Sequence, residues 1–405
     1  MPQQEPAAPV AVQFGAGNIG RGFLGELFHA SGYRTVFVDV DPALVDALNR
    51  RGAYEVHHIT NEGDAPVGIS GVSALGAADL QAVARAVAGA SVACTAVGVR
   101  ALKAVAPALA QGILLRVRQG IEAPLNVITC ENLVGAGCVL RDLVWAEIAS
   151  PAGAASQAGA GAAARPPLGR AEFEARFGFV EAVVSRMVPI VPDDVRRRDP
   201  LWIACEPYAR LPVDARAFRG PVPRIAGLEP VASILAYQRR KLASHNMSHA
   251  VAAYLGYQAG CEFIWQAIAD ASIAGAVRGA MDETGRALVS RFGFDPAEQR
   301  AYQEDLLGRY GNRALGDQVR RVAADPLRKL GPEDRLIGSA RLCFEEGVDP
   351  RFVVAGIRAA LGYNNADDAG AVRLQEMLAS RGREAVLRDV CGLSTGEPLY
   401  ARLRE

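Results

Sequence analysis

The pattern of hydrophobic and polar positions changes at about residue 230, and this change divides the chain into two kinds of structure. Before that point, short apolar runs of strand length alternate with longer stretches whose apolar residues recur at three- and four-residue spacing. Such alternation predicts parallel strands connected by helices, and therefore an α/β fold with a doubly wound sheet. The predicted strands are 10–14, 35–38, 54–59, 67–72, 91–98, 125–130 and 180–191.

Helical periodicity dominates from residue 230 to the end of the chain, with turn-forming pairs such as Asp295-Pro296 between the helices. The predicted helices are 230–255, 258–291, 296–308, 315–323, 333–346, 350–362, 369–379 and 382–390. We therefore expect a sheet domain over residues 1–195, followed by a mostly α-helical domain over residues 196–405. Residues 151–167 are rich in Ala, Gly and Pro, and predict a flexible loop that carries no chemistry.

A glycine-rich turn follows the first predicted strand. Gly15, Gly17 and Gly20 stand at G-x-G-x-x-G spacing, and a helical pattern runs from residue 19 to residue 30. In this arrangement the first glycine permits a tight turn, the second lets the backbone approach a pyrophosphate, and the third lets helix and strand pack closely. The N–H groups at the helix start favour a bound diphosphate. Together these features predict a Rossmann-type dinucleotide-binding domain.

An acidic residue after the second predicted strand indicates which dinucleotide binds. Asp39 lies 19 residues after Gly20, where a carboxylate accepts hydrogen bonds from the adenosine ribose hydroxyls and repels a 2′-phosphate. Asp41 adds further negative charge, and no Arg or Lys stands between residues 36 and 48. The sequence therefore favours NAD over NADP as the cofactor.

The ends of two later strands extend this candidate site, because ligands of doubly wound sheets bind at the carboxyl ends of the strands. Residues 96–98 end one strand and are expected beside the dinucleotide, with a plain strand end as the alternative. Asn132 follows the next strand, and its amide is a candidate donor to a carbonyl oxygen, although a capping or loop role fits its position equally well. The predicted cofactor contacts are Phe14, Gly15, Ala16, Gly17, Asn18, Ile19, Gly20, Asp39, Ala96, Val97 and Gly98.

A second polar cluster lies near the start of the helical half. On an α-helix each residue advances by about 100°, so Lys241, His245, Asn246 and His249 would share one half of the helix surface. A solvated helix face is the alternative interpretation. Such a face usually carries carboxylates beside its cations, however, and none stands between residues 230 and 262.

The chemistry of this cluster is that of a metal-free alcohol dehydrogenase. Hydride transfer from an alcohol carbon needs a base for the hydroxyl proton, and a lysine serves when burial beside cations lowers its pKa. Lys241 is the candidate base. The amides of Asn246 and Asn132 are candidate donors to the developing alkoxide, and His249 is placed to orient the substrate hydroxyl or to tune the lysine.

Composition excludes several other classes of function. Lys and Arg together number 44, as do Asp and Glu, so the chain has no net charge to attract nucleic acid. No apolar run reaches membrane-spanning length, and the N-terminus lacks the basic and apolar regions of a signal peptide.

The cysteines and histidines predict neither disulfides nor a metal site. The seven cysteines are scattered and contain no C-x-x-C pair, which is typical of reduced thiols in a cytoplasmic protein. Only five histidines are present, and no H-E-x-x-H helix, so no bound metal is expected.

With both constellations in view, the sequence resembles the polyol-specific long-chain mannitol dehydrogenase family over nearly its whole length, except at residues 151–167. The set Lys241, Asn246 and His249 matches the K-x4-N-x2-H motif of that family. The other matching stretches are F-G-A-G-N-I-G-R-G-F from residue 14, T-A-V-G from 95, C-E-N from 130, D-P-L-R-K-L from 325 and D-R-L-I-G from 334.

The resemblance implies that Lys241 is the general acid/base and that Asn132, Asn246 and His249 position and polarise the reacting oxygen. It also implies an NAD-dependent interconversion of mannitol 1-phosphate and fructose 6-phosphate. A length of 405 residues is closer to the phosphate-using branch than to the longer branches. Two positions near the expected active site depart from the family pattern. Ser185 stands where the family commonly has Asp, and His245 stands where it usually has an apolar residue.

A phosphorylated substrate needs cationic partners, and Arg328, Lys329 and Arg335 are candidates, with a surface role as the alternative. Two other functions stay open: a dehydrogenase of unphosphorylated mannitol or of a hexuronate, and a nonenzymatic dinucleotide-binding sensor. The intact motif argues against the sensor, which has no need of a proton relay. The expected partner is a small sugar phosphate or polyol, and the expected assembly is a monomer or a small homo-oligomer.

Overall fold

The computed structural model describes residues 8–150, 168–189 and 191–404, so the loop predicted at 151–167 lies outside the described residues. The chain divides into two compact units, Met1–Leu235 and Ala236–Glu405. This division falls well after residue 195, where the sequence placed the boundary.

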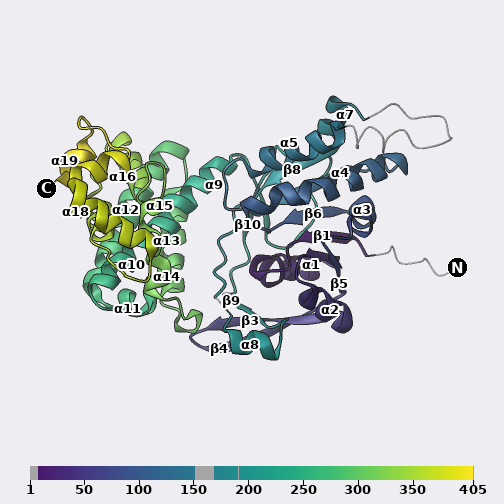
Figure 1. Cartoon of the computed structure of the whole chain (residues 1–405), viewed down its shortest axis with the longest axis horizontal. Helices are drawn as coiled ribbons and strands as arrows, with labels where there is room; N and C mark the ends of the chain where they lie inside the picture. The colour runs from purple at the N-terminus through teal and green to yellow at the C-terminus, as the bar shows by residue number, and fades with distance from the viewer. Residues whose placement is uncertain (1–7, 151–167, 190, 405) are drawn as a thin grey trace. The chain divides into compact units, whose positions relative to one another are not determined.

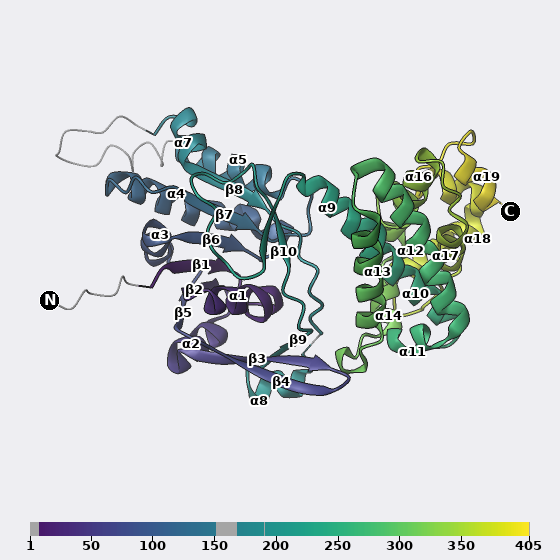
Figure 2. The same cartoon turned by 180° about the vertical axis from the view of Figure 1, so that it is seen from behind.

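A six-stranded parallel sheet forms the centre of the first unit, in the order β5-β2-β1-β6-β7-β8 (Figures 1 and 2). The chain winds from β1 outward to β2 and β5 and then returns to the other side of β1 with β6, so the direction reverses between β1 and β6. Such a reversal opens a ligand-binding crevice at the carboxyl ends of the strands. The predicted doubly wound sheet is therefore confirmed. Its strands are Val10–Phe14 (β1), Arg34–Asp39 (β2), Val72–Gly76 (β5), Val92–Thr95 (β6), Leu125–Thr129 (β7) and Phe177–Glu181 (β8).

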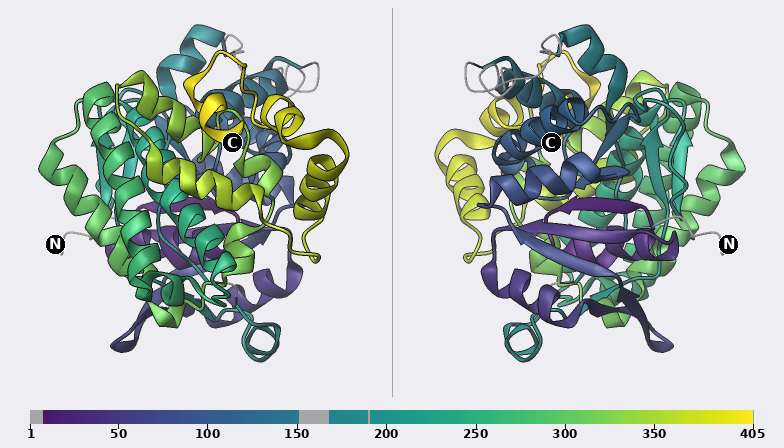
Figure 3. Two further views of the ribbon diagram at one scale, coloured as in Figure 1. Left: turned by 90° about the vertical axis from the view of Figure 1, so that its left-hand side faces the viewer. Right: turned by 90° about the vertical axis from the view of Figure 1, so that its right-hand side faces the viewer.

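Helices cover both faces of this sheet because its strands are apolar on both sides. In β1, Val12 and Phe14 face one core and Ala11 faces the other. The first core is closed by α3 (Leu80–Gly89), α4 (Leu102–Arg118), α5 (Ala136–Ala149) and α7 (Arg170–Arg176), the second by the helix Gly20–Leu24 and its continuation α1 (Gly25–Ala30). Figure 2 shows the sheet between these two layers, and in the right-hand view of Figure 3 the purple strands lie directly below the blue helices.

A second, three-stranded sheet and a strand pair complete the first unit. The hairpin β3 (Ala53–Thr60) and β4 (Gly63–Ser70) pairs through β3 with β9 (Ile203–Cys205), and β10 (Leu211–Asp214) pairs with β11 (Leu228–Val231). Because β9 is hydrogen-bonded to β3, residues well beyond 195 belong to the sheet-bearing unit. That pairing between distant segments explains why the unit boundary lies later than the sequence pattern indicated.

Two predicted strands were wrong in their limits. The strand predicted at 67–72 is the end of β4 and the start of β5, separated by Gly71 at a φ of +70°. The strand predicted at 180–191 lies mostly outside the sheet, because β8 ends at Glu181. Beyond it, Val183 N–H donates to the carbonyl of Pro212, so the chain just after β8 pairs with β10.

The second unit is built from helices, as the periodicity predicted. Its longest helices are α12 (Ala271–Phe292) and α18 (Ala369–Asp389), and Gly382 interrupts α18 at a φ of +78°. The helix α10 (Met247–Gln258) is buried almost all round, and packs against α12, α14 (Val319–Ala323) and α17 (Arg351–Leu361). α9 (Ile234–Arg240) spans the boundary between the units, and the other α-helices of the second unit are α11 (Ile264–Ala269), α13 (Pro296–Tyr310), α15 (Pro326–Lys329), α16 (Ile337–Glu345) and α19 (Pro398–Arg404). Among the described residues, no helix is both long and apolar enough to cross a bilayer.

Arg116 gives a test of the first unit's packing. Its buried guanidinium, from the last turn of α4, donates to the carbonyls of Ala88, Ala90 and Ala123. Arg116→Met would leave these carbonyls without their donor, at a cost of about 1–3 kcal/mol for each unpaired buried group. We expect urea unfolding to show a loss of at least about 2 kcal/mol. The control Arg85→Met, on the exposed face of α3, should change stability by less than about 0.5 kcal/mol.

Candidate functional site

The glycine turn has the shape that its spacing predicted. Gly15 has a φ of +88°, and a Cβ added there would lie 2.4 Å from the carbonyl oxygen of Ala96. A Cβ on Gly20 would lie 1.9 Å from the carbonyl oxygen of Gly15. Since both distances are far below contact distance, these two glycines allow turn, strand and helix to pack together.

Gly17 differs from its two neighbours because it faces open space. It is exposed, and a Cβ added there would meet nothing within 4 Å. Among the described residues, no acceptor is bonded to the N–H groups of Gly17 and Asn18. These exposed donors stand just before the helix Gly20–Leu24, where backbone N–H groups attract anions.

Asp39 is the last residue of β2 and closes the other side of the turn. One carboxylate oxygen accepts from the N–H of Ala16 at 2.7 Å, and the other accepts from the N–H of Asp41 at 3.0 Å. A carboxylate has about four lone-pair sites, so further acceptor capacity remains. One cation does lie nearby, Arg21, but its buried guanidinium donates to the carbonyls of Ala16 and Leu201.

Glu131 shapes the turn at the end of β6. Its two carboxylate oxygens accept from the N–H groups of Val97 and Gly98 at 3.0 and 2.8 Å. The N–H of Ala96 donates to Phe14. The backbone donors of residues 96–98 are therefore engaged within the protein, and only carbonyls and Cα surface remain for a ligand. Beside Glu131, Asn132 is exposed.

Together these features fit a dinucleotide. Exposed N–H groups and an open glycine suit a pyrophosphate, and an acidic residue with spare lone pairs suits ribose hydroxyls. The residues that would hold NAD are those of the turn, Asp39 and the 96–98 turn that Glu131 fixes.

In the second unit, the segment predicted as an α-helix contains a π-helix over Lys241–Asn246. The N–H of Met247 donates to the carbonyl of Leu242, five residues back. In an α-helix, residues five apart differ by about 140°, whereas in a π-helix they lie roughly one turn apart. Lys241 and Asn246 therefore lie closer to the same face of the helix than they would in the α-helix predicted from the sequence.

Lys241 combines partial burial with the absence of a counter-ion. No hydrogen bond or ion pair to its ammonium is formed by residues that the structure describes. Burial, helped by the charge of Arg335, lowers the pKa of Lys241 to about 8. A lysine with this pKa exchanges a proton near neutral pH, as a general acid/base requires.

His249, in the first turns of α10, is fixed from two sides. Its Nε2 lies 2.8 Å from a carboxylate oxygen of Asp317, and its ring stacks on Tyr310 with centroids 4.8 Å apart and planes 8° apart. The Asp317 oxygen lies at ion-pair distance but out of line with the ring N–H. Asn246 directly precedes α10 and is half-buried. Its side-chain amide forms no hydrogen bond with the described residues.

His245 departs from the other members of the cluster. It is buried, its Nδ1 has no partner among the described residues, and burial holds its pKa well below the usual value. It is therefore a neutral core side chain, unlike Lys241, Asn246 and His249, which are half-buried.

The three basic residues proposed from the sequence have different surroundings. Arg328 is half-exposed and pairs with Asp325 and Asp334. Arg335 is mostly buried and uses its Nε for Asp334. Lys329 is only 5% exposed, and its ammonium has no hydrogen bond or ion pair among the described residues. Burial and the charge of Arg335 lower the pKa of Lys329 to about 8.

Sequence reasoning missed the acidic partners of the cluster because it searched only nearby positions. Arg240 pairs with Glu298 of α13 at 3.1 Å, and His249 lies against Asp317, which precedes α14. Both acids come from distant parts of the chain. A lone acid before a short helix carries no local signal of such a role.

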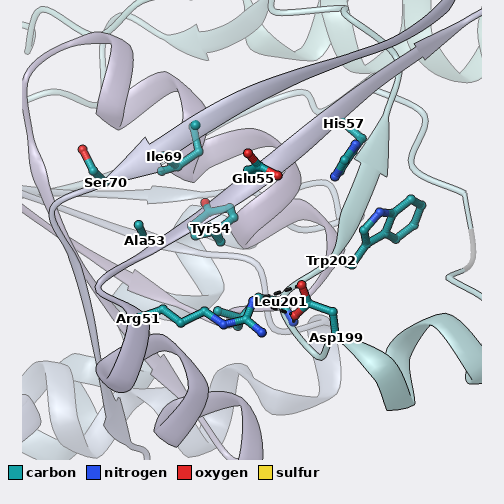
Figure 4. Close-up of a pocket in the computed structure, with 11 residues that line it drawn as sticks. Arg51, Ala53, Tyr54, Glu55, His57, Ile69, Ser70, Asp199, Leu201 and Trp202 are labelled. Carbon is teal, nitrogen blue, oxygen red and sulfur yellow. Dashed lines mark hydrogen bonds and ion pairs between the residues drawn. The ribbon is translucent and has the colours of Figure 1, made fainter.

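Two other features of the first unit are separate from this site. Glu26, His58 and Cys205 place potential metal-ligating atoms within 4.8 Å of one another, but the Glu26 carboxylate is already paired with Arg186 and His58. A pocket of about 580 Å³ beside β3 and β4 contains none of the predicted site residues (Figure 4). Its main charged pair, Arg51 and Asp199, is mutually neutralised.

Comparison with known proteins identifies close relatives along the whole chain. Residues 9–227 match the mannitol dehydrogenase Rossmann domain, and residues 233–392 match the mannitol dehydrogenase C-terminal domain. A mannitol-1-phosphate 5-dehydrogenase of Bacillus licheniformis is 40% identical over 392 residues, which cover 96% of this chain and 97% of that protein. One of Brevibacillus brevis is 39% identical over 396 residues, covering 98% and 97%.

Solved structures with the same fold include two polyol dehydrogenases. The ternary complex of Pseudomonas fluorescens mannitol 2-dehydrogenase with NAD and D-mannitol has a TM-score of 0.70 at 18% identity, covering 98% of this chain and 90% of that one. A D-sorbitol dehydrogenase in substrate-free form has a TM-score of 0.74 at 16% identity, covering 98% and 92%.

Gly17 and Gly20 allow the binding and packing roles of the turn to be separated. Gly17→Ala should leave the melting temperature unchanged, because the new methyl group meets no protein atom within 4 Å. It should weaken NADH binding by about 10-fold or more, since the methyl group blocks backbone approach to the pyrophosphate. Gly20→Ala, which collides with Gly15, should lower both stability and binding. NADH affinity is measured by fluorescence titration, and stability by thermal melting. Unchanged NADH affinity in Gly17→Ala would show that this turn does not bind the cofactor.

Proposed function

The chain belongs to the mannitol dehydrogenase family, and on this premise we propose that it interconverts mannitol 1-phosphate and fructose 6-phosphate with NAD. The observation that carries the proposal is the partly buried Lys241, which has no counter-ion among the described residues and shares a helical segment with Asn246 and His249. The two relatives named mannitol-1-phosphate 5-dehydrogenase support the phosphorylated substrate.

In the direction of alcohol oxidation, Lys241 in its neutral form accepts the hydroxyl proton on Nζ while the carbon–hydrogen bond breaks. When bound, NAD supplies the hydride acceptor, and the substrate carbon becomes a carbonyl. Asn246 donates to the reacting oxygen as negative charge develops on it, and His249 orients the hydroxyl. Asn132, in the first unit, is assigned to the same oxygen from the family resemblance. In reduction, the Lys241 ammonium returns the proton to that oxygen.

We propose that Lys329 and Arg335 bind the substrate phosphate, and that Arg328 contributes less to this binding. Lys329 has an unpaired ammonium, and the two Nη groups of Arg335 have no hydrogen-bond partner among the described residues. Lys329, a buried cation with no acid among the described residues, and the unused Nη groups of Arg335 favour an anion, since a phosphate would relieve the repulsion between the two cations. Arg328 already pairs with two carboxylates, so it adds positive charge near the phosphate but does not contact it directly.

The cellular setting is also part of the proposal. All seven cysteines are unpaired thiols, which supports a reducing compartment, the cytoplasm. We keep the expectation of a monomer or a small homo-oligomer, which sedimentation of the purified protein measures.

The pKa of Lys241 gives a direct kinetic prediction. Because the neutral amine is the base, kcat/KM for mannitol 1-phosphate oxidation should rise with pH through about 8 and then level. Because the ammonium is the acid, kcat/KM for fructose 6-phosphate reduction should fall above the same pH. Lys241→Met should lower kcat by at least about 100-fold and leave NADH affinity within about threefold. A variant that keeps its activity would show that another group carries the proton.

Substrate preference tests the phosphate assignment. NADH oxidation should be at least about 100-fold more efficient with fructose 6-phosphate than with fructose or a keto-hexuronate, a difference of about 2.7 kcal/mol in transition-state binding. Lys329→Met should raise the KM for fructose 6-phosphate and remove most of that preference. Arg328→Met, at the paired and exposed position, should have a clearly smaller effect. Equal efficiency with fructose in the unmodified enzyme would instead favour the dehydrogenase of an unphosphorylated polyol.

A further inference from the structure

A carboxylate that the family motif does not contain stands beside the motif histidine. Asp317 Oδ2 lies 2.8 Å from His249 Nε2, and the two side chains are only 12% and 15% exposed. Asp317 lies in the turn between the short helix Arg313–Leu315 and α14, far along the chain from α10. The pair is thus formed by tertiary packing and is largely withdrawn from water, where a charged contact is stronger than at the surface.

The Asp317 carboxylate is itself held in place. Its second oxygen, Oδ1, accepts from the guanidinium of Arg321, one helical turn later. Its backbone carbonyl accepts from Ile264 N–H at 2.9 Å, and the carbonyl of Glu262 accepts from Val319 N–H at 2.8 Å. Oδ1 therefore contacts Arg321, and Oδ2 contacts His249.

The electrostatic state of Asp317 suits this role. Burial alone would raise the pKa of its carboxyl, but hydrogen bonding and charge from His249 and Arg321 outweigh burial and hold the pKa below the usual range. Asp317 is therefore an anion at neutral pH.

Tyr310 restrains the His249 ring from a third direction. The two rings are nearly parallel, and the Tyr310 hydroxyl is anchored by Ser248 Oγ at 2.9 Å and by the carbonyl of His245 at 2.8 Å. A ring that stacks on an anchored aromatic side chain and has a fixed carboxylate 2.8 Å from one nitrogen has little rotational freedom left.

The arrangement also selects the tautomer of His249. A carboxylate is an acceptor only, so the nitrogen that faces it carries the proton, and the neutral ring then has its lone pair on Nδ1. No hydrogen bond to Nδ1 is formed by the described part of the chain, and Nδ1, unlike Nε2, is not among its fully buried polar atoms that lack a hydrogen-bond partner. Nδ1 is consequently the nitrogen that remains for a ligand.

We propose that Asp317 is a positioning residue, which holds the ring and the Nε2–H tautomer of His249 so that Nδ1 accepts a hydrogen bond from a substrate hydroxyl. This inference rests on the proposed function, because it takes His249 to contact the substrate. Asp317 acts only through His249 and does not touch the reacting atoms.

The first test replaces the carboxylate by its amide. Asp317→Asn keeps the shape but offers an N–H₂ group that also fits the opposite tautomer, so kcat should fall by about 10- to 100-fold. NADH affinity should stay unchanged, because that cofactor is assigned to residues of the first unit. The matched control is Asp64→Asn, which makes the same change beside His57 at 2.8 Å on an exposed hairpin, and should leave kcat unchanged. Full kcat in folded Asp317→Asn would overturn the proposal.

A double-mutant cycle separates this inference from the proposed function. If Asp317 acts through His249, then Asp317→Asn should cost little more in a His249→Ala background, so the two effects are not additive. Additive losses would show that Asp317 acts by another route and would overturn the inference. If His249→Ala alone retained full activity, the proposed role of His249 would fail first.

A longer acid keeps the test decisive if Asp317→Asn does not fold. Asp317→Glu retains the charge and a partner for Arg321 but moves the carboxylate by one methylene relative to the ring. Turnover should fall by about 10-fold with unchanged NADH affinity and melting temperature. Wild-type kcat in Asp317→Glu would show that the position of this carboxylate does not govern the histidine.

Discussion

The second unit holds the Lys241 ammonium partly buried and without a counter-ion among the described residues, and this sets the chemistry of its polar cluster. Lys241 would be more stable as a charged group beside an acid, yet none of the described carboxylates lies within ion-pair distance of it. The helix turns at this point through a π-helical segment, and Arg335 adds like charge nearby. Burial and this like charge lower the pKa of Lys241 to about 8, so its proton is easily lost or gained near neutral pH.

The acidic side chains near the cluster form ion pairs with other residues, and none of them pairs with Lys241. Glu298 pairs with Arg240, and Asp334 pairs with Arg335, while Asp317 serves His249 and Arg321. Each acid neutralises a neighbour of the cluster and none reaches its centre.

In the first unit, carboxylate side chains hold the backbone of the two candidate cofactor-binding turns in place. Glu131 binds two backbone N–H groups of the turn after β6, and Asp39 binds that of Ala16. The exposed donors of Gly17 and Asn18 are left over. It is notable that a π-helical turn stands in both functional stretches, at Gly20–Leu24 and at Lys241–Asn246. An added residue per turn is a known way to shift side chains at functional sites.

Local patterns of propensity, spacing and chemistry predicted the alternation of strands and helices, the glycine turn with Asp39, and the motif that contains Lys241. They also identified the family. Three features depend on tertiary packing and could not be predicted in this way: β9 belongs to the first unit, the motif helix is partly a π-helix, and Asp317 faces His249. Tertiary structure also distinguishes Lys329, which is buried and has no ion pair among the described residues, from Arg328, which is paired at the surface. The physical reason is that burial and charge pairing depend on which distant segments pack together, and a local pattern of residues contains no record of that.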